Sequence, residues 1–479
     1  MLPLALLACT GSWTTPDNPI TRFDDTGAQE SGVLVSHERE LRGVWIATVW
    51  NINWPSESGL SASASQAELL TLLDTAQASG LNAVFFQVRP EADALYASEL
   101  DPWSRYLTGT QGQDPGWDPL QFVLDEGHAR GLEVHAWLNP YRAKASASAS
   151  AASNHQSVVN SQYAYTYGST LWLDPGAPAV QDHLEAVIRD LVTRYDVDGV
   201  HFDDYFYPYP DGSDFPDDAT YAAYGGGMSL ADWRRDNVNR MMERVAQTVA
   251  EIDPQVRFGI SPFGIYRPGQ PEGISGLDQY ESLYADPVLW KAEGWVDYLA
   301  PQLYWPSSQS AQAFGPLVQW WANLPQAGRH TFSGHALYQL GSSSSWDVDE
   351  IREQVRLTRE AGGTGSIYYH IDPLVQNTDG IRDVFSQELY ATPALPPAVF
   401  DQADTKVRVP TLTQTDAGVE VDHPTARWWL TYRADGNAWT LVSIHPASED
   451  TLPLTSGHWA ISAANKAGVE SRGVEVVVP

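Results

Sequence analysis

The chain has 479 residues, of which 43% are hydrophobic and 18% are charged, so it is able to bury a large core. Its 28 Lys and Arg residues stand against 60 Asp and Glu residues, which gives a formal net charge of −32. Such a surface repels phosphate backbones and anionic lipid headgroups, so the composition argues against nucleic acid as a partner.

The chain begins with a short apolar stretch that ends at its single cysteine, Cys9. One cysteine excludes an intramolecular disulfide and any cysteine-based metal site. The run Leu6-Leu7-Ala8-Cys9 resembles the lipobox of bacterial lipoproteins, in which the cysteine is lipidated after the signal segment is removed. We therefore expect residues 1–9 to be a signal remnant with Cys9 as the lipidation site, and the alternative is a disordered apolar end.

Residues 10–38 are rich in Thr, Pro, Asp, Gly and Ser and show no periodicity, which predicts a disordered tether. No later segment approaches the ~20 apolar residues that a membrane span needs. The sequence therefore predicts contact with a membrane only through a lipid anchor.

Short apolar runs alternate with amphipathic segments between residues 39 and 391. Eight βα units in this order predict a (β/α)8 barrel, while a doubly wound sheet needs fewer units and a glycine-rich phosphate turn that is not found. The predicted strands are 42–49, 83–90, 133–140, 199–205, 257–263, 296–305, 331–338 and 365–371, and the helices include 66–79, 119–130, 179–195, 230–252 and 348–361.

The end of the chain changes character after residues 392–397 (TPALPP), which predict a stiff linker. Residues 398–479 alternate in the manner of short strands at 426–433, 440–444, 458–464 and 473–478, with a hairpin turn at Asp435-Gly436. We expect a small all-β sandwich, and its segment WAISAANKAGVES (459–471) resembles the end of a fibronectin type III module. An Ala/Ser run at 143–153 predicts a flexible loop.

In such a barrel the catalytic groups lie at the C-terminal ends of the strands, and alternate residues of each strand point inward. This period turns His201, Asp203 and Tyr205 inward, and leaves open the direction of Asp204, where the strand ends. Four other strands add polar and aromatic groups: His135, Trp137 and Asn139; Gln87 and Arg89, followed by Glu91 and Asp93; Gln302, Tyr304 and Trp305; and Tyr368, His370 and Asp372. Carboxylates, amides and aromatic rings together suit a polyhydroxylated substrate.

Glycoside hydrolysis needs one carboxyl group as the acid and a second as the nucleophile or base. We expect Asp203 to be the ionised group, held charged by His201 and Arg89. Asp93, Glu91, Asp204 and Asp372 are all candidates for the acid. The alternatives are that Asp203 only orients a neighbour and that Asp204 only caps the loop.

Four histidines, His135, His201, His335 and His370, come from four strands and form no HxH or HExxH pattern. We therefore expect no metal and no other cofactor. A metal-dependent polysaccharide deacetylase stays an alternative, as does a non-catalytic glycan-binding lipoprotein.

Eight segments, each at a predicted strand end or in a loop beside one, resemble the bacterial glycosyl-hydrolase-like 10 family. They are 40–55 (ELRGVWIATVWNINWP), 87–96 (QVRPEADALY), 103–120 (WSRYLTGTQGQDPGWDPL), 135–142 (HAWLNPYR), 171–176 (LWLDPG), 198–210 (DGVHFDDYFYPYP), 259–266 (GISPFGIY) and 296–305 (VDYLAPQLYW). The resemblance spans residues 39–390. It implies a TIM-barrel glycosidase of the cell envelope, with relatives that cleave peptidoglycan glycan strands already stripped of peptides.

The resemblance also implies roles for single residues. Its HFDDY motif marks Asp203 and Asp204 as the central acidic pair, and its RPxADA pattern favours Asp93 over Glu91 as their partner. The residues expected at the substrate face are Trp45, Asn51, Gln87, Arg89, His135, Asn139, Tyr141, Arg142, His201, Tyr205, Phe263, Gln302, Tyr304, Trp305 and His370, and the rings expected to stack on sugars are Trp45, Trp50, Trp54, Tyr205 and Trp305.

The sequence thus predicts an endo-acting hydrolase of an N-acetylated wall glycan, with a polysaccharide as its partner. Asp203 or Asp204 is the expected nucleophile or base and Asp93 the expected acid. The expected location is the cell envelope, by a lipid anchor at the outer membrane or periplasmic face, or outside the cell. The C-terminal module is expected to be a spacer, with attachment to the wall polymer as the alternative.

Overall fold

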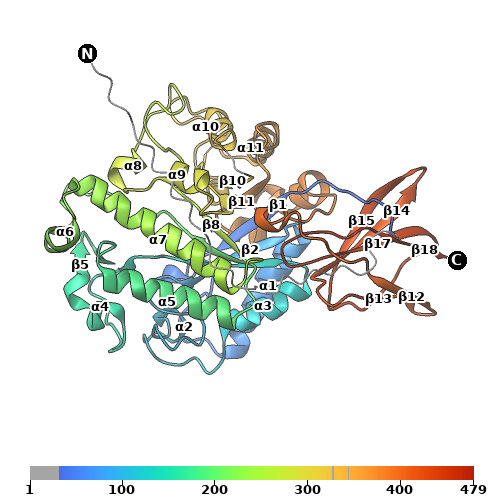
Figure 1. The fold of residues 1–479 in the computed structure, drawn as a ribbon, viewed down its shortest axis with the longest axis horizontal. Helices are drawn as coiled ribbons and strands as arrows, with labels where there is room; N and C mark the ends of the chain where they lie inside the picture. The colour runs from blue at the N-terminus through green and yellow to red at the C-terminus, as the bar shows by residue number, and fades with distance from the viewer. Residues whose placement is uncertain (1–31, 326–327, 344) are drawn as a thin grey trace, which may run out of the picture.

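The computed structural model describes residues 32–325, 328–343 and 345–479, so Cys9 and the expected signal remnant lie outside the described residues. Within this part of the chain, eight parallel strands close into a barrel in the order β1-β11-β10-β9-β8-β7-β3-β2 (Figure 1). The strands are β1 (Leu41–Ile46), β2 (Ala83–Arg89), β3 (Glu133–Leu138), β7 (Gly199–Phe202), β8 (Arg257–Ile260), β9 (Tyr298–Leu299), β10 (His330–His335) and β11 (Gly365–Tyr368). The predicted (β/α)8 barrel is confirmed.

Helices connect successive strands and cover the outside of the barrel (Figure 1). They are α1 (Ala62–Ala78), α3 (Pro119–Ala129), α5 (Pro178–Arg194), α7 (Leu230–Ile252), α8 (Gln279–Ser282), α9 (Pro287–Ala292), α10 (Phe314–Ala322) and α11 (Val348–Glu360), followed by α12 (Asp372–Gln376) and α13 (Ile381–Val384). The sequence reasoning missed α10 because Gly315 and Pro316 are poor helix signals. Both lie in the first turn, where the absent N–H of proline has no intrahelical partner to lose.

Successive side chains of each strand point alternately into the barrel and out toward the helices, so the barrel has two separate hydrophobic cores. Phe85, Trp137 and Tyr298 belong to a cluster inside the barrel, whereas Val84 and Phe86 belong to the larger cluster between the strands and the helices. Strand β9 is shorter than the predicted 296–305, because Pro301 has no N–H to give to a ladder. Beyond it, Gln302 makes only isolated bridges with Phe263 and Gly334.

The loop after β3 is built rather than flexible, which corrects the prediction for 143–153. It begins with β4 (Arg142–Lys144), which joins β6 (Thr170–Leu173) and β5 (Ala164–Tyr167) in a small antiparallel sheet in the order β4-β6-β5. The Lys144 ammonium donates to the carbonyl oxygens of Ala147 and Ala149 at 3.3 and 2.8 Å, and Glu91 accepts the N–H of Ala145. These backbone partners are what the low-complexity sequence does not reveal.

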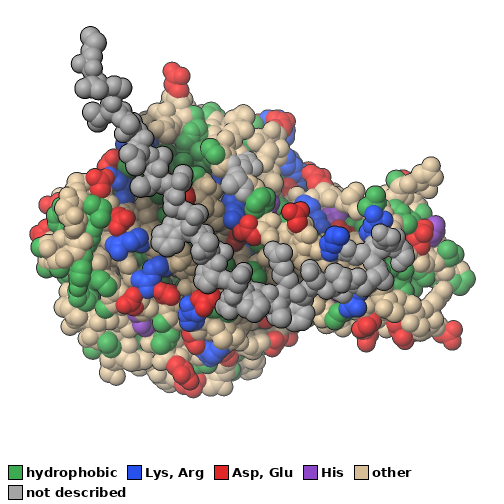
Figure 2. Space-filling view, viewed as in Figure 1, with side chains coloured by type: hydrophobic (Ala, Val, Ile, Leu, Met, Phe, Trp, Pro, Cys, Tyr) green, Lys and Arg blue, Asp and Glu red, His purple; other side chains and the backbone are tan. Residues whose placement is uncertain are grey.

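Two antiparallel sheets follow the barrel and confirm the expected small all-β domain, which lies to one side of the barrel in Figure 1. The strands are β12 (Thr411–Thr415), β13 (Gly418–Asp422), β14 (Trp428–Asp435), β15 (Ala438–Pro446), β16 (Thr451–Leu452), β17 (Gly457–Ala464) and β18 (Val474–Val478), and the sheets run β12-β13-β16 and β15-β14-β17-β18. Asp435 pairs with Ala438 across a two-residue turn, as Asp435-Gly436 predicts. Figure 2 shows acidic side chains along the lower edge of this domain.

The C-terminal domain is docked on the N-terminal ends of the barrel strands, opposite the catalytic face of such barrels. Arg427 pairs with Asp196 at 2.8 Å and with Asp198, just before β7, at 3.2 Å, and Lys466 reaches Asp196 and Asp253, each at 2.9 Å. The stretch expected to link the two parts is itself fixed, because Leu395 is buried and its carbonyl accepts the N–H of Glu40 at 3.0 Å.

The end of the expected tether is also ordered, which corrects the predicted boundary of disorder. Val33 pairs with Gly473 of the C-terminal domain, and Nδ1 of His37 lies 2.8 Å from the hydroxyl of Tyr432. Residues 32–38 therefore belong to the folded body. None of the helices in the described ranges is both long and apolar enough to cross a membrane.

Candidate active site

Strand β7 carries two consecutive aspartates to the C-terminal end of the barrel, called the mouth below. Asp203 and Asp204 follow Phe202, the last residue of β7, and each is 4% exposed. Carboxyl groups this deeply buried lose hydration, so the ionised form needs hydrogen-bond donors around it. Hydrogen-bond donors surround both carboxyls.

Asp203 receives three donors. Its Oδ2 accepts the indole N–H of Trp137 at 3.0 Å and a hydrogen bond from the side-chain amide of Asn139, and its Oδ1 accepts the backbone N–H of Tyr205 at 3.3 Å. Trp137 and Asn139 share the inward parity of β3 that the sequence predicts. The structure thus brings together the predicted inward residues of β3 and β7.

Burial raises the pKa of Asp203 to about 7, with a further rise from the neighbouring Asp204, although Arg142 acts to lower it. The expectation that His201 and Arg89 keep Asp203 charged is wrong. The Arg89 guanidinium pairs with Asp101 at 2.7 Å instead. Burial and the nearby His135 hold the pKa of His201 well below its ordinary value, so its imidazole is neutral.

Asp204 is held from the rim of the mouth. Its Oδ2 accepts the hydroxyl hydrogen of Tyr209, and Gln302 from the segment after β9 adds a second side-chain hydrogen bond. Burial raises the pKa of Asp204 above its ordinary value, and these two donors oppose the rise. The sequence left the direction of Asp204 open, and the structure turns it toward Tyr209.

A polar layer behind the pair fixes its supports. Gln87 accepts the backbone N–H groups of Thr48 and Val49, each at 2.9 Å, and donates to Oδ1 of Asn139 at 2.6 Å. Arg142 donates to the same oxygen at 2.8 Å and lies 5.0 Å from the ring centre of Tyr205. Gln87 and Asn139 are fully buried, so they orient neighbours of Asp203 and present no surface to a ligand.

A hydrogen-bonded chain runs through the barrel interior beneath the mouth. The indole N–H of Trp45 donates to Nε2 of His201 at 3.1 Å, so the hydrogen of His201 is on Nδ1 and is directed to the Tyr298 hydroxyl at 3.0 Å. That hydroxyl in turn meets Nδ1 of His135 at 3.1 Å, and Nε2 of His135 meets Glu133 at 3.1 Å. His135 and His201 are fully buried and Trp45 is 2% exposed, so this row of hydrogen bonds is internal. The expectation that these three residues lie at the substrate face, with Trp45 stacked on a sugar, is therefore wrong.

Aromatic rings form the rim of the mouth. Phe263 packs edge-on against Trp305 at 5.6 Å, and Tyr304 lies stacked on Tyr369 at 6.1 Å. Tyr205, Phe263, Tyr304 and Trp305, all predicted at the substrate face, are each partly exposed. Three rim tyrosines were missed by the sequence reasoning: Tyr209, Tyr338 and Tyr369.

Besides Trp45, three aromatic residues expected at the mouth lie elsewhere. Trp54 is fully buried against Phe86 and Trp117, and its indole N–H donates to the carbonyl of Ser65 at 2.9 Å, so it is unable to stack on a sugar. Tyr141 is fully buried in the core between strands and helices.

Tyr368 is the third, because the inward parity of β11 is the opposite of the predicted one. Ile367 belongs to the interior cluster and Tyr369 packs against it, whereas Tyr368 contacts Phe385 and Tyr390 on the helix side. His335 likewise faces outward, toward Gln354 and Ser366, each at 2.9 Å.

Three remaining residues lie on loops above the barrel. The Asn51 amide donates to the carbonyls of Pro55 and Tyr106 at 2.9 and 3.0 Å, so it ties its own loop to α2 (Arg105–Thr108). Trp50 is 56% exposed, with the Arg105 guanidinium 5.6 Å from its ring centre. His370 is partly exposed and lies 2.9 Å from the amide of Asn53.

Asp93 lies in the loop after β2 and is fully buried. Its Oδ1 accepts the N–H of Glu91 at 2.9 Å and its Oδ2 accepts from Gln111 at 3.4 Å, while burial and the charge of Glu91 raise its pKa to about 7. Glu91 forms a two-pronged ion pair with Arg105 at 2.7 and 2.9 Å. Among the described residues, no hydrogen bond or ion pair links Asp93 to the pair on β7.

The described ranges contain no group of three or more His, Cys, Asp or Glu side chains placed to hold a metal ion.

A closed parallel barrel with paired carboxyls and an aromatic rim at the strand ends is the general arrangement of barrel glycosidases. The sequence profile of the glycosyl hydrolase-like 10 family matches residues 40–350, and the chain belongs to this family.

Similar proteins include glycosyl hydrolase YngK of Bacillus subtilis (strain 168), which is 40% identical over 426 residues, covering 83% of this chain and 84% of that protein. Glycosyl hydrolase DigH of Escherichia coli (strain K12) is 38% identical over 372 residues, or 73% of this chain and 84% of that protein. Among solved structures, the glycoside hydrolase domain of PgaB (BpsB) from Bordetella bronchiseptica aligns with a TM-score of 0.49 and 15% identity, covering 73% of this chain and 98% of that one.

Proposed function

We propose that the chain is a glycoside hydrolase that cleaves the glycan strands of the cell wall, with peptide-stripped peptidoglycan as its substrate. The observation that carries this proposal is the buried Asp203–Asp204 pair at the mouth, with the pKa of Asp203 raised to about 7. A group that exchanges its proton near neutral pH is suited to general acid–base work. Two carboxyls with different donors around them supply the two roles that glycosidic cleavage requires.

In this mechanism Asp203 gives its proton to the glycosidic oxygen as the bond to the anomeric carbon breaks. Asp204 stays ionised, supported by the Tyr209 hydroxyl and by Gln302, and stabilises positive charge on the sugar ring or activates water. The sequence reasoning gave the acid role to Asp93, which remains a prediction to be tested beside Asp203.

The rim supports a polysaccharide as the substrate. Tyr205, Phe263 and Trp305 are partly exposed rings of the kind that stack on sugar faces, and the amide oxygen of the partly exposed Gln302 is able to accept from hydroxyl or N-acetyl groups. The choice of a wall glycan rests on the family resemblance, and a lipid on Cys9 would hold the chain at the cell envelope where that glycan lies.

Incubation of the protein with intact and with peptide-stripped peptidoglycan, followed by mass spectrometry of the products, tests the proposal. We expect soluble glycan fragments with new reducing ends from the stripped polymer, and turnover lowered by several orders of magnitude in Asp203→Asn and Asp204→Asn. Asp297→Asn serves as the control, because Asp297 is a mostly buried aspartate beside β9 at the opposite end of the barrel.

The other outcomes separate the alternatives. Binding without new reducing ends supports a glycan-binding protein, and release of acetate supports a deacetylase. Near-wild-type turnover in a folded Asp203→Asn variant overturns the assignment of Asp203. A loss confined to Asp93→Asn returns the acid role to Asp93. Retention of a Cys9→Ala variant in the membrane fraction contradicts the lipid anchor.

A further inference from the structure

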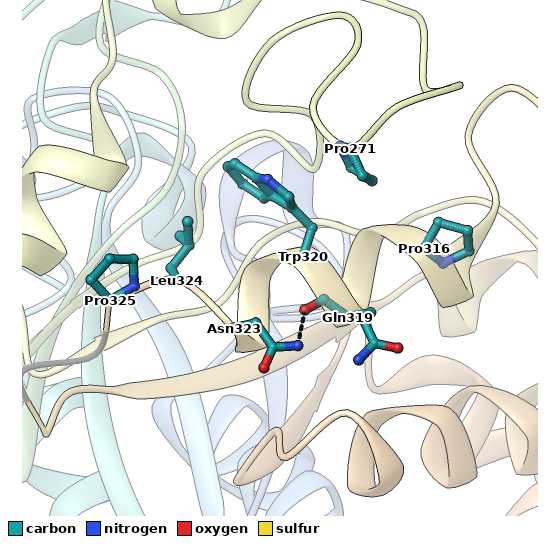
Figure 3. A pocket seen from close by; sticks show the side chains of 7 residues that line it. All are labelled: Pro271, Pro316, Gln319, Trp320, Asn323, Leu324 and Pro325. Atoms are coloured by element: carbon teal, nitrogen blue, oxygen red, sulfur yellow. Dashed lines mark hydrogen bonds between the residues drawn. The ribbon is translucent and has the colours of Figure 1, made fainter.

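A shallow pocket of about 380 Å³ lies on the outer side of α10, apart from the mouth (Figure 3). Its apolar lining comes from Trp320, Pro316 and Leu324 on and after α10 and from Pro271 on the loop after β8. Pro325 and the amide side chains of Gln319 and Asn323 complete it. Among the described residues that line this α10 pocket, none carries a charge, although the whole chain has a net charge of −32.

Trp320 gives the pocket a rigid flat ring. Its indole is partly exposed and lies stacked on Tyr266 with ring centres 5.7 Å apart and planes 20° apart. Trp321 packs against it edge-on at 5.0 Å, and the Tyr266 hydroxyl is fixed by Asp286 at 3.1 Å. A ring already held in place loses little conformational entropy when a ligand stacks on it.

The polar side chains that line the pocket, Gln319 and Asn323, are neutral and exposed. Gln319 and Asn323 lie four residues apart along one side of the helix. The Asn323 amide nitrogen donates to the backbone carbonyl of Gln319 at 2.7 Å, which turns its side-chain oxygen outward (Figure 3). A pocket lined by an aromatic ring and neutral amides suits a pyranose, which has an apolar face and a rim of hydroxyls, whereas a charged ligand finds no counter-ion among these lining residues.

The loop after β8 connects this pocket to the mouth. It includes Phe263, which packs on Trp305 at the rim, and Pro271, which lines the pocket. The indole N–H of Trp321 donates to the carbonyl of Gly264 at 2.8 Å, so α10 is fastened to this loop beside the rim. The same loop therefore carries a residue of the rim, Phe263, and a residue of the pocket, Pro271.

We propose that the α10 pocket is a second sugar-binding site, which holds a neutral sugar unit of the same polysaccharide whose other units occupy the mouth. This inference rests on the proposed function. It goes further by separating polymer attachment at Trp320 from bond cleavage at the Asp203–Asp204 pair. The pocket would matter for long or insoluble chains and would be irrelevant to a substrate too short to reach it.

Co-sedimentation with insoluble peptide-stripped peptidoglycan tests this, in an Asp203→Asn background that leaves the polymer uncut. We expect Trp320→Ala to weaken binding to the sedimenting polymer about tenfold. Trp320→Phe keeps a flat ring, so we expect it to weaken this binding less. Tyr224→Ala is the matched control, since Tyr224 is a 48% exposed ring on α6 (Asp218–Tyr224). Gln319→Ala removes only an exposed amide of the pocket and leaves the core intact, and we expect it to weaken sedimentation too, but by less than Trp320→Ala.

Turnover of a short soluble glycan in the otherwise wild-type protein supplies the second readout, and we expect Trp320→Ala to leave it unchanged within about twofold. Sedimentation that is independent of Trp320, or absent in the Asp203→Asn parent, overturns the inference. Loss of short-substrate turnover in Trp320→Ala also overturns it, because the pocket would then belong to the mouth. If no glycan is cleaved but sedimentation depends on Trp320, the α10 pocket stands and the proposed catalysis fails.

Discussion

The Tyr209 hydroxyl donates a hydrogen bond to Oδ2 of Asp204, so a tyrosine of the loop after β7 covers the second carboxyl of the pair. Tyr209 is 36% exposed, and its ring packs edge-on against Phe263 at 6.1 Å. The tyrosine therefore has two separable parts. The ring belongs to the aromatic rim, and the hydroxyl favours the ionised form of Asp204.

Tyr209→Phe keeps the ring and removes the hydroxyl. The pKa of Asp204 is then expected to rise further, because the donor that opposed the effect of burial is lost. If Asp204 works ionised, the acid limb of the pH–rate profile moves to higher pH by about one unit, and kcat/KM on the acid side falls about tenfold. Tyr224→Phe, at an exposed tyrosine of α6, is the control, and an unmoved acid limb in Tyr209→Phe would contradict the role.

Asp203 is expected to lower the free energy of unfolding at neutral pH. Its pKa is about 7 in the folded chain, against about 3.9 for an unfolded aspartate, so the folded state holds a proton that the unfolded state has lost between these values. The free energy of unfolding therefore falls as pH rises from about 4 to 7 and is unaffected by this group outside that window. Asp203→Asn is expected to gain stability relative to the parent across the same window, by up to a few kcal/mol.

Urea unfolding of both proteins at pH 4, 6 and 8, together with turnover, checks this prediction. Asparagine mismatches some of the donors around Asp203, which lowers the stability of the variant by the same amount at every pH. The pH dependence of the difference is therefore the diagnostic quantity. A difference that stays constant from pH 4 to pH 8 would show that Asp203 is ionised in the fold.

Strand periodicity predicted much of the site. The inward parity of β3 and β7 is correct, and so is the convergence of Asn139, Asp203 and Gln302 on one face of the barrel. These positions follow from a local rule, since side chains of a strand alternate and parallel strands end at the same face. The rule failed on β11, where the polar set Tyr368, His370 and Asp372 imitates an inward face but Ile367 fills the interior.

Partners supplied by loops were beyond sequence reasoning. Arg89 was expected to reach Asp203, yet it pairs with Asp101, which is twelve residues further along an aperiodic loop. Trp54 has an aromatic ring of the kind that stacks on sugars. Its loop folds back, however, so that the indole N–H donates to the backbone carbonyl of Ser65 in α1. In both cases the decisive contact depends on where a loop returns, and no period in the sequence records that.

The hydrogen-bonded chain in the barrel interior is expected to support stability more than catalysis. In Tyr298→Phe, Nδ1 of His201 and Nδ1 of His135 lose their shared partner in the fully buried interior. Leaving two buried polar groups unpaired costs about 2–4 kcal/mol of the free energy of unfolding. Because none of the three residues bonds to Asp203, kcat is expected to change only a few-fold.

Chemical denaturation and turnover of Tyr298→Phe supply the test, with Tyr280→Phe as a partly exposed tyrosine outside the barrel interior for comparison. A large fall in kcat without a fall in the free energy of unfolding would instead show that the hydrogen bonds of Tyr298 take part in catalysis.

The C-terminal domain is expected to unfold together with the barrel, because its contacts neutralise buried charge at the barrel base. Asp198 is 1% exposed, and despite burial His128 and Arg427 hold its pKa well below the ordinary value. Arg427→Met removes one of these cations and leaves buried charge less well compensated, at an expected cost of about 2–4 kcal/mol at neutral pH. An aspartate with a lowered pKa contributes stability above its unfolded pKa of about 3.9 and loses that contribution as pH falls below it. We therefore expect the free energy of unfolding of Arg427→Met to stay below that of the parent down to about pH 4, and the difference to shrink only at lower pH.

Calorimetry at neutral and acid pH distinguishes a docked domain from a free spacer. Arg433→Met is the control, because Arg433 is exposed on β14 and contacts Trp459 within its own domain. A docked domain predicts one main transition that Arg427→Met moves to lower temperature and Arg433→Met leaves nearly in place. A spacer predicts two transitions, with the barrel transition indifferent to Arg427. We expect the single transition. Asp198 is buried and Lys466 forms a second ion pair with Asp196, so separation of the two domains would leave carboxylates of the barrel without their cations.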